Sequence, residues 1–151
     1  MKIVIQRVSS ASVRVDGRVV GEIGRGFLVL FGAETGDSEA LAAEAARKVA
    51  GLRVFDDETG RMNLSLADVG GRVLAVSQFT LGADLSRGRR PGFERALRGP
   101  EAAPLWESFV DALRGQDLQV ETGVFGAAME VALVNDGPAT FLLELPRGAK
   151  A

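Results

Sequence analysis

The sequence contains no histidine, no cysteine and no tyrosine. Without histidine and cysteine, the chain has no Ser-His-Asp triad, no Cys-His dyad and no thiolate or imidazole ligands for zinc. Without tyrosine, no phenol is available as a proton donor or acceptor. A hydrolase of this composition must therefore use carboxylates, lysine, main-chain donors or groups that its substrate supplies.

Long hydrophobic runs are also missing. No stretch of about 18 apolar residues is present, and the first residues alternate too regularly for a signal peptide. The sequence thus predicts a cytoplasmic protein without a membrane partner. The net charge of -2 gives no overall indication of nucleic-acid binding, although most of the 18 basic residues are arginines, which suit forked phosphate contacts.

The length and the periodicity predict one α+β domain over residues 1–145 and a loose tail over residues 146–151. Asp16-Gly17 is typical of a hairpin turn, and Ser38 and Gly51 are expected to bound a helix. A second helix is predicted near residues 101–114. Further strands are expected over residues 2–8, 27–31, 52–55, 72–81, 118–121, 127–134 and 140–145. Two helices against many strands favour a three-layer α/β/β arrangement, with two packed sheets and the helices outside.

Two polar strings interrupt apolar strands and indicate where the chemistry lies. Ser77-Gln78-Phe79-Thr80-Leu81 continues a predicted buried strand, where polar groups need partners or a purpose. In an ideal strand, Gln78 and Thr80 share a face. Asn135-Asp136-Gly137-Pro138-Ala139-Thr140 is predicted to be a tight turn between two strands, and it offers mainly main-chain atoms.

These strings, together with Ile5-Gln6-Arg7-Val8 and Met62-Asn63-Leu64, resemble the D-aminoacyl-tRNA deacylases. The resemblance runs from about Met1 to Leu145 and implies the three-layer fold. It also implies a homodimer with active sites at the subunit interface, an aminoacyl-tRNA substrate, and no metal or organic cofactor. One departure is Ala139, where the family more often has valine.

The resemblance implies ester hydrolysis at the first string, Ser77, Gln78, Phe79 and Thr80. The Gln78 amide and the N–H groups of Phe79 or Thr80 are candidate donors to a developing oxyanion. Thr80 has neither a histidine base nor an N-terminal position to make it a nucleophile. A ribose hydroxyl of the substrate is therefore expected to assist water instead.

The resemblance assigns substrate binding to the second string. It implies a cis Gly137-Pro138 bond whose carbonyls enter the partner's site and exclude L side chains, so that glycyl esters escape rejection. Arg7 is expected to hold this turn, with Asn135 beside it. Phe125 and Met129 are expected to line a pocket for the terminal adenosine, although core packing is the alternative for both.

Other patterns are weaker. Arg87, Arg89 and Arg90 begin an arginine-rich loop that either grips tRNA phosphates or is simply solvated. Gly21–Gly26 opens a strand, which argues against a phosphate loop, and Asp56-Asp57-Glu58 is typical of a charged turn rather than a metal site.

The alternatives to a deacylase are a noncatalytic RNA-end binding module and a bare dimerisation domain.

Overall fold

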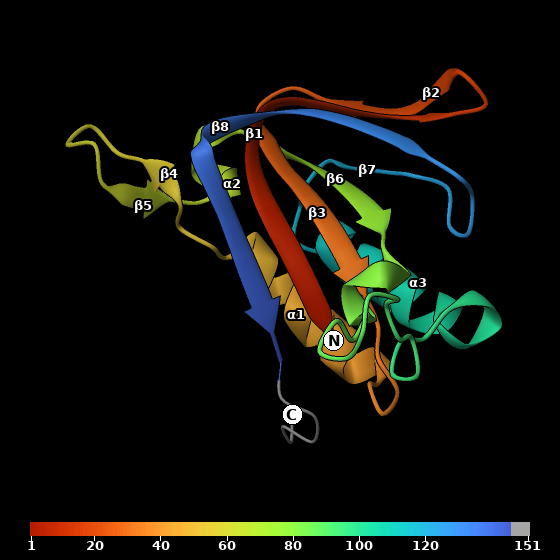
Figure 1. Cartoon of the computed structure of the whole chain (residues 1–151). Helices are drawn as coiled ribbons and strands as arrows, with labels where there is room; N and C mark the ends of the chain where they lie inside the picture. Colours follow the sequence, from red (N-terminus) through yellow and green to blue (C-terminus); the bar gives the residue numbers. More distant parts are fainter. Residues whose placement is uncertain (146–151) are drawn as a thin grey trace.

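The computed structural model describes residues 1–145, so the predicted tail at residues 146–151 lies outside the described part (Figure 1). A six-stranded sheet has the order β2-β1-β3-β6-β7, with β8 paired to β1, and β4 and β5 form a separate two-stranded sheet. The strands are β1 (Lys2–Val15), β2 (Arg18–Ile23), β3 (Gly26–Gly32), β4 (Phe55–Asp56), β5 (Met62–Leu64), β6 (Arg72–Ser77), β7 (Val120–Thr122) and β8 (Glu130–Glu144). The helices are α1 (Glu39–Ala50), α2 (Leu66–Val69) and α3 (Ala103–Arg114), with short 3-10 helices η1 (Phe79–Gly82) and η2 (Gly99–Glu101).

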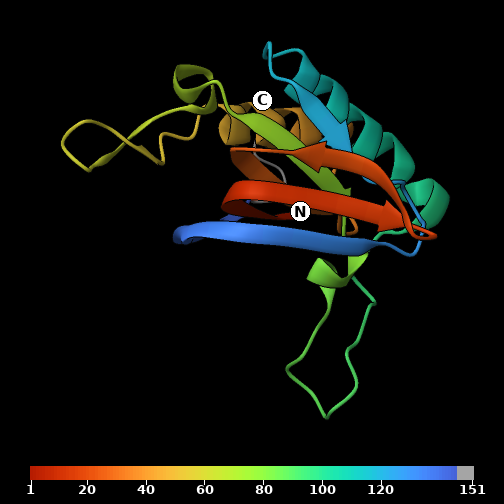
Figure 2. The same cartoon turned by 90° about the horizontal axis from the view of Figure 1, so that it is seen from above.

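The two long helices lie where the sequence predicts them. The Ser38 hydroxyl accepts a hydrogen bond from the Leu41 N–H at 3.2 Å, and the Gly51 N–H donates to the Arg47 carbonyl at the other end of α1. Helices α1 and α3 pack side by side over one face of the sheet (Figures 1 and 2). No helix within residues 1–145 is long and apolar enough to cross a membrane.

Two hydrophobic clusters occupy opposite faces of β3 and β6. Phe27 and Val29 face α1 and α3, whereas Leu28 belongs to a smaller cluster on the other face, as the two-residue period of a strand requires. The smaller cluster also holds Leu74 of β6 and Val13 from the far half of β1. The mixed α and β composition is confirmed, and the three-layer stacking of two packed sheets stays a prediction.

Strand β6 is shorter than expected, which corrects the predicted strand over residues 72–81. Its parallel pairing with β3 ends at Ser77, and the Gln78 N–H makes one last hydrogen bond to the Phe31 carbonyl at 2.7 Å. The chain then coils into η1, where the Leu81 N–H donates to the Gln78 carbonyl. Gln78 and Thr80 therefore do not share a strand face, because the chain has left the sheet.

The second polar string lies within a single strand, β8, where the sequence predicts a tight turn between two strands. Both halves of β8 pair antiparallel with β1, and the register shifts between them, with Val8 opposite Asn135 and Gln6 opposite Thr140. One residue of β1, Arg7, therefore faces the four residues 136–139 of β8. These four residues bulge out of the sheet as a loop, hereafter the Gly-Pro loop.

Smaller elements complete the comparison. The Asp16-Gly17 hairpin is confirmed, with φ of 50° at Asp16 and 76° at Gly17. Residues 52–54 are not a strand, and β4 covers only Phe55 and Asp56. The sequence reading missed α2, a single turn whose Ser65 and Asp68 satisfy each other's main-chain N–H groups in a capping box.

Candidate functional site

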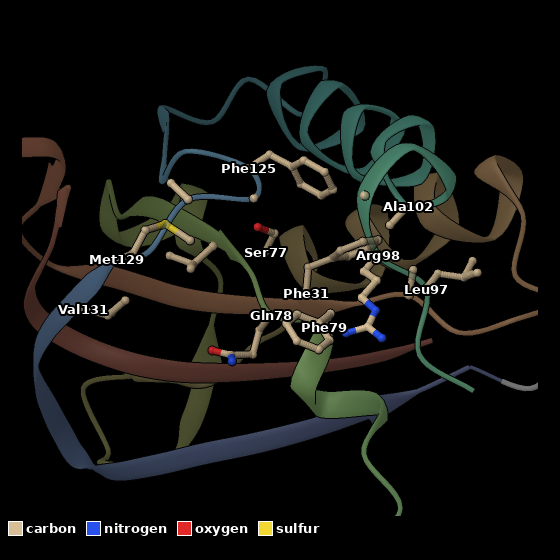
Figure 3. Close-up of a pocket in the computed structure, with 15 residues that line it drawn as sticks. Phe31, Ser77, Gln78, Phe79, Leu97, Arg98, Ala102, Phe125, Met129 and Val131 are labelled. Atoms are coloured by element: carbon tan, nitrogen blue, oxygen red, sulfur yellow. The ribbon is translucent and has the colours of Figure 1, made fainter. Parts of the chain in front are cut away.

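A cavity of about 240 Å³ opens at the end of β6, where the chain leaves the sheet (Figure 3). One wall comes from β3, β6 and η1, a second from the segment around η2, and a third from the residues leading into β8. Among residues 1–145, no Asp, Glu or Lys side chain lines this cavity. The lining residues are Phe31, Ala33, Val76, Ser77, Gln78, Phe79, Leu97, Arg98, Gly99, Ala102, Phe125, Gly126, Ala127, Met129 and Val131.

Gln78 is positioned by the close approach of η1 to β3. A Cβ at Gly32 would lie 2.8 Å from the Leu81 Cβ and 2.9 Å from the Gln78 carbonyl oxygen, so only glycine lets the two segments pack this tightly. The Gln78 side chain donates from Nε2 to the Thr80 hydroxyl. The predicted Gln78-Thr80 pair therefore exists, but a local turn creates it and not strand alternation.

The start of η1 leaves two main-chain donors available beside Gln78. The first N–H groups of a helix have no partner within it. The N–H groups of Phe79 and Thr80 accordingly make no hydrogen bond to any acceptor in the described part of the chain. Three donors, two from the main chain and one from a side chain, thus belong to consecutive residues at the end of β6.

An aromatic cluster supports the far wall of the cavity. Phe125 stacks on Trp106 with ring centroids 6.3 Å apart, and Trp106 packs against Phe31 at 5.8 Å. Trp106 is nearly buried, and it is the only tryptophan of the chain. Phe125 and Met129 both line the cavity, so neither is only a core residue, and their part in binding a terminal adenosine stays a prediction (Figure 3).

Arg98 is the one charged residue of the described chain that lines the cavity, and the sequence reading did not select it. Its guanidinium lies over the Phe79 ring, 5.3 Å from the ring centroid, in the geometry of a cation–π contact (Figure 3). The only available signal was its place near the end of the arginine-rich segment, and that position does not distinguish it from its neighbours.

Arg7 of β1, which is 6% exposed, holds the Gly-Pro loop through hydrogen bonds. Arg7 Nε donates to the Asp136 carbonyl at 2.9 Å, and Nη1 donates to the Val54 carbonyl at 2.6 Å. The Asn135 side chain accepts from the Ala139 N–H at 2.6 Å and closes the neck of the loop. The Gly137–Pro138 peptide bond is cis, as the resemblance implied.

The two predicted groups of site residues do not meet within one chain. None of residues 135–140 lines the cavity that holds Gln78, Phe125 and Met129. In Figure 1 the bend of β8 lies beside the β4–β5 hairpin, well away from η1. The Gly-Pro loop therefore lies apart from the cavity of its own chain.

The arginine-rich loop projects from the body of the protein (Figure 2). Arg87, Arg89 and Arg90 are all exposed on it. Its base is closed by a pair of main-chain hydrogen bonds between Asp84 and Gly92 at 2.8 and 2.9 Å. Hydrogen bonds from Ser86 hold the pKa of Asp84 below its ordinary value.

Two alternative sites find no support. Gly21 to Gly26 runs from β2 into β3 and opens no helix, so it lacks the geometry of a phosphate loop. Asp57 accepts hydrogen bonds from the Thr59 and Arg61 N–H groups and closes the β4–β5 hairpin as a charged turn. Within residues 1–145, no cluster of three acidic side chains is placed to hold a metal ion.

A family model and curated relatives each match almost the whole length of this chain. A family model described as D-Tyr-tRNA(Tyr) deacylase matches residues 4–144. A D-aminoacyl-tRNA deacylase of Symbiobacterium thermophilum is 58% identical, covering 95% of both chains. Another, from Pelobacter propionicus, is 56% identical and covers 95% of this chain and 99% of its own.

Two solved structures have a similar fold. One, a c-Myc DNA Unwinding Element Binding Protein, is 41% identical with a TM-score of 0.89, and the match covers 97% of this chain and 99% of that one. The other is described as a probable eukaryotic D-amino acid tRNA deacylase. It is 17% identical with a TM-score of 0.82 over 95% of this chain and 98% of its own, and it bears on the fold alone.

Proposed function

The chain belongs to the D-Tyr-tRNA(Tyr) deacylase family, and from this premise we propose that it hydrolyses the ester bond of D-aminoacyl-tRNA in the cytoplasm. The observation that carries the proposal is the composition of the cavity. Hydrogen-bond donors of residues 78–80 lie at the end of β6, and no carboxylate, lysine or histidine of residues 1–145 lines the cavity as a base.

Hydrolysis of an ester passes through an intermediate with negative charge on the former carbonyl oxygen. In our proposal, the N–H groups of Phe79 and Thr80 and the Gln78 amide stabilise that charge, next to Ser77 at the end of β6. The hydrogen bond from Gln78 to Thr80 orients the amide and leaves its second N–H free. The Thr80 side chain only positions the Gln78 amide in this scheme and forms no covalent bond to the substrate.

The attacking water needs a base, and the substrate supplies it. A ribose hydroxyl neighbours the scissile ester in every aminoacyl-tRNA, and it orients or deprotonates water once the terminal adenosine is bound beside Phe125 and Met129. The apolar lining of the cavity suits a nucleobase. The proposed reaction requires neither a metal nor an organic cofactor.

Rejection of L-aminoacyl esters is assigned to the Gly-Pro loop of a second subunit. The loop presents main-chain carbonyls of Gly137 and Pro138, held by Arg7 and by Asn135. Carbonyls that occupy the space of an L side chain exclude it regardless of its chemistry. Glycyl-tRNA has no side chain to exclude, so its hydrolysis at a lower or comparable rate belongs to the same proposal.

The surface of β8 supports the proposed homodimer. Val134 and Leu142 on this strand are 57% and 62% exposed, on either side of the loop. Burial of such apolar side chains favours association. Because the loop does not line the cavity of its own chain, a second copy would offer the cavity in which it acts.

The tRNA body is proposed to contact the projecting loop. Arg87, Arg89 and Arg90 lie within four residues on an exposed segment that directly follows η1. Arginine pairs with phosphates through two parallel hydrogen bonds. These contacts position the acceptor end and carry no sequence information.

A noncatalytic nucleic-acid binding module is the second candidate, and the similar structure of a protein named for binding a DNA unwinding element favours it. A release assay with D-Tyr-tRNA and L-Tyr-tRNA separates the two candidates. The deacylase releases D-tyrosine well above the rate in buffer and spares the L ester. Equal, buffer-level release from both esters would support the binding module.

A further inference from the structure

Arg98 carries a positive charge that the proposed chemistry does not use. It lines the cavity, it is exposed, and no carboxylate in residues 1–145 lies within ion-pair distance of its guanidinium. An arginine without a carboxylate partner at the mouth of a ligand cavity is free to bind an anion.

The charge is held in place at both ends of the side chain. At the main chain, the neighbouring Leu97 N–H donates to the Ala33 carbonyl at 2.9 Å and fixes the segment against the end of β3. At the tip, the guanidinium lies over the Phe79 ring. That ring also packs against the Phe93 ring, with the two centroids 5.4 Å apart. The side chain is thus ordered before any ligand arrives, which reduces the entropy lost on binding.

The position of Arg98 restricts which anion it meets. Phe79 begins η1, immediately after Gln78, so the guanidinium lies near the end of the cavity where the ester is proposed to react. In a 3′-esterified nucleotide, the ester and the 5′-phosphate are both attached to the ribose. A cation beside the reactive end is therefore within reach of that phosphate, while the base occupies the apolar wall near Phe125.

We propose that Arg98 binds the 5′-phosphate of the substrate's terminal nucleotide and so selects polynucleotide esters over esters of a bare nucleoside. The inference rests on the proposed deacylase function. It adds a phosphate subsite to that cavity and gives Arg98 a part in binding, with no part in the chemical step. Free nucleoside monophosphates carry the same group, so they are expected to occupy the same subsite.

The test compares two substrates that differ in this phosphate, D-tyrosyl-tRNA and the D-tyrosyl ester of adenosine. Arg98→Gln is expected to raise KM for the tRNA by about tenfold, with kcat unchanged, because one charge-assisted contact is lost. The adenosine ester is expected to be cleaved equally by both proteins. Arg98→Lys should recover part of the loss, and Arg95→Gln, a neighbouring exposed arginine that does not line the cavity, is the matched control.

Salt dependence and direct binding give two further readouts. Arg98→Gln should flatten the plot of log kcat/KM against log salt by about 0.7 for the tRNA, the value for one phosphate contact in a single strand. The fluorescence of Trp106, the only tryptophan, reports occupation of the cavity through Phe125. Adenosine 5′-monophosphate should bind more tightly than adenosine to the natural chain and no more tightly to Arg98→Gln.

Each contrary result has a distinct meaning. If Arg98→Gln raises KM equally for both esters, Arg98 contacts the ester or the base and not the phosphate. If KM and kcat are unchanged for both esters, Arg98 contacts none of these groups. Either result overturns the proposal. If the natural chain cleaves neither ester, the deacylase function itself fails. The comparison of adenosine with its monophosphate then still decides whether Arg98 provides a phosphate subsite.

Discussion

Arg7 Nε and the main-chain oxygen of Asp136 lie 2.9 Å apart, in a hydrogen bond that joins β1 to the Gly-Pro loop. The same guanidinium donates to the buried carbonyl of Val54 at 2.6 Å. One side chain therefore sets the position of the loop relative to the β4–β5 hairpin, and its fork geometry allows it to reach both carbonyls at once.

We expect Arg7→Gln to reduce the preference for D over L esters by about tenfold or more, since the loop loses its hydrogen bond and the Val54 carbonyl loses a buried partner. The preference of Arg7→Lys for D over L esters should lie between those of the unsubstituted protein and of Arg7→Gln, because an ammonium keeps the charge but offers no planar fork. Rates on D-Tyr-tRNA and L-Tyr-tRNA measure the effect. Arg14→Gln, an exposed arginine on the same strand, is the control, and an unaltered preference in Arg7→Gln would refute the role.

Gly137→Ala is expected to displace the loop. Gly137 has φ of 143°, and a Cβ there would lie 2.8 Å from the Ala139 nitrogen and 3.1 Å from Arg7 Nη2. The main chain must shift to relieve this contact, so cleavage of L esters should rise relative to D esters. Gly24→Ala, where a Cβ meets nothing within 4 Å, provides the matched substitution. Normal selectivity in a folded Gly137→Ala protein would place the filter elsewhere.

Gln78→Ala should lower kcat by about 10² to 10³, the usual cost of removing one oxyanion donor. Thr80→Ala should keep most of the activity, because the substitution leaves the main-chain N–H in place and removes only the hydroxyl that accepts the orienting hydrogen bond from Gln78. Single-turnover kinetics with D-Tyr-tRNA measure both variants. An acyl-enzyme trapped on Thr80, or no turnover in Thr80→Ala despite normal binding, would replace this scheme with covalent catalysis.

Acid is expected to loosen the β4–β5 hairpin. Hydrogen bonds from the Thr59 hydroxyl and from the Arg61 and Thr59 N–H groups lower the pKa of Asp57, so its contribution to stability is present above the ordinary aspartate pKa and is lost as the pH falls below about 4. Amide hydrogen exchange at Arg61 should therefore accelerate relative to the intrinsic rate in that range. Asp57→Asn should weaken this dependence, whereas Glu58→Gln should leave it intact.

The sequence predicts most of the helices and strands because local signals set them. Ser38 and Gly51 bound α1 through hydrogen bonds within one turn, and Asp16-Gly17 makes a hairpin from its own left-handed conformation. The end of β6 is different. It depends on the absence of a side chain at Gly32, remote in sequence, which lets η1 pack against β3. No local pattern carries that information.

The candidate site divides in the same way. Gln78, Phe125 and Met129 were predicted from the resemblance, and the cavity brings them together. Arg98 was missed because its distinction is spatial: only the fold places it over Phe79 and away from every carboxylate of residues 1–145. The sequence predicts a tight turn between two strands at the Gly-Pro loop, and an Asp-Gly-Pro sequence fits such a turn and a bulge within one strand equally well.

Strand β8 pairs with β1 on both sides of the Gly-Pro loop, so the sheet continues past the loop that is proposed to set selectivity. Val8 still pairs with Asn135 on one side and Gln6 with Thr140 on the other, and the register shift between these pairs is taken up by the four residues 136–139. Residues 136–139 can therefore be substituted, in evolution or by design, while the pairing of β8 with β1 is kept. A descendant with a different stereochemical or size preference requires changes in residues 136–139 and at Arg7, and no new fold.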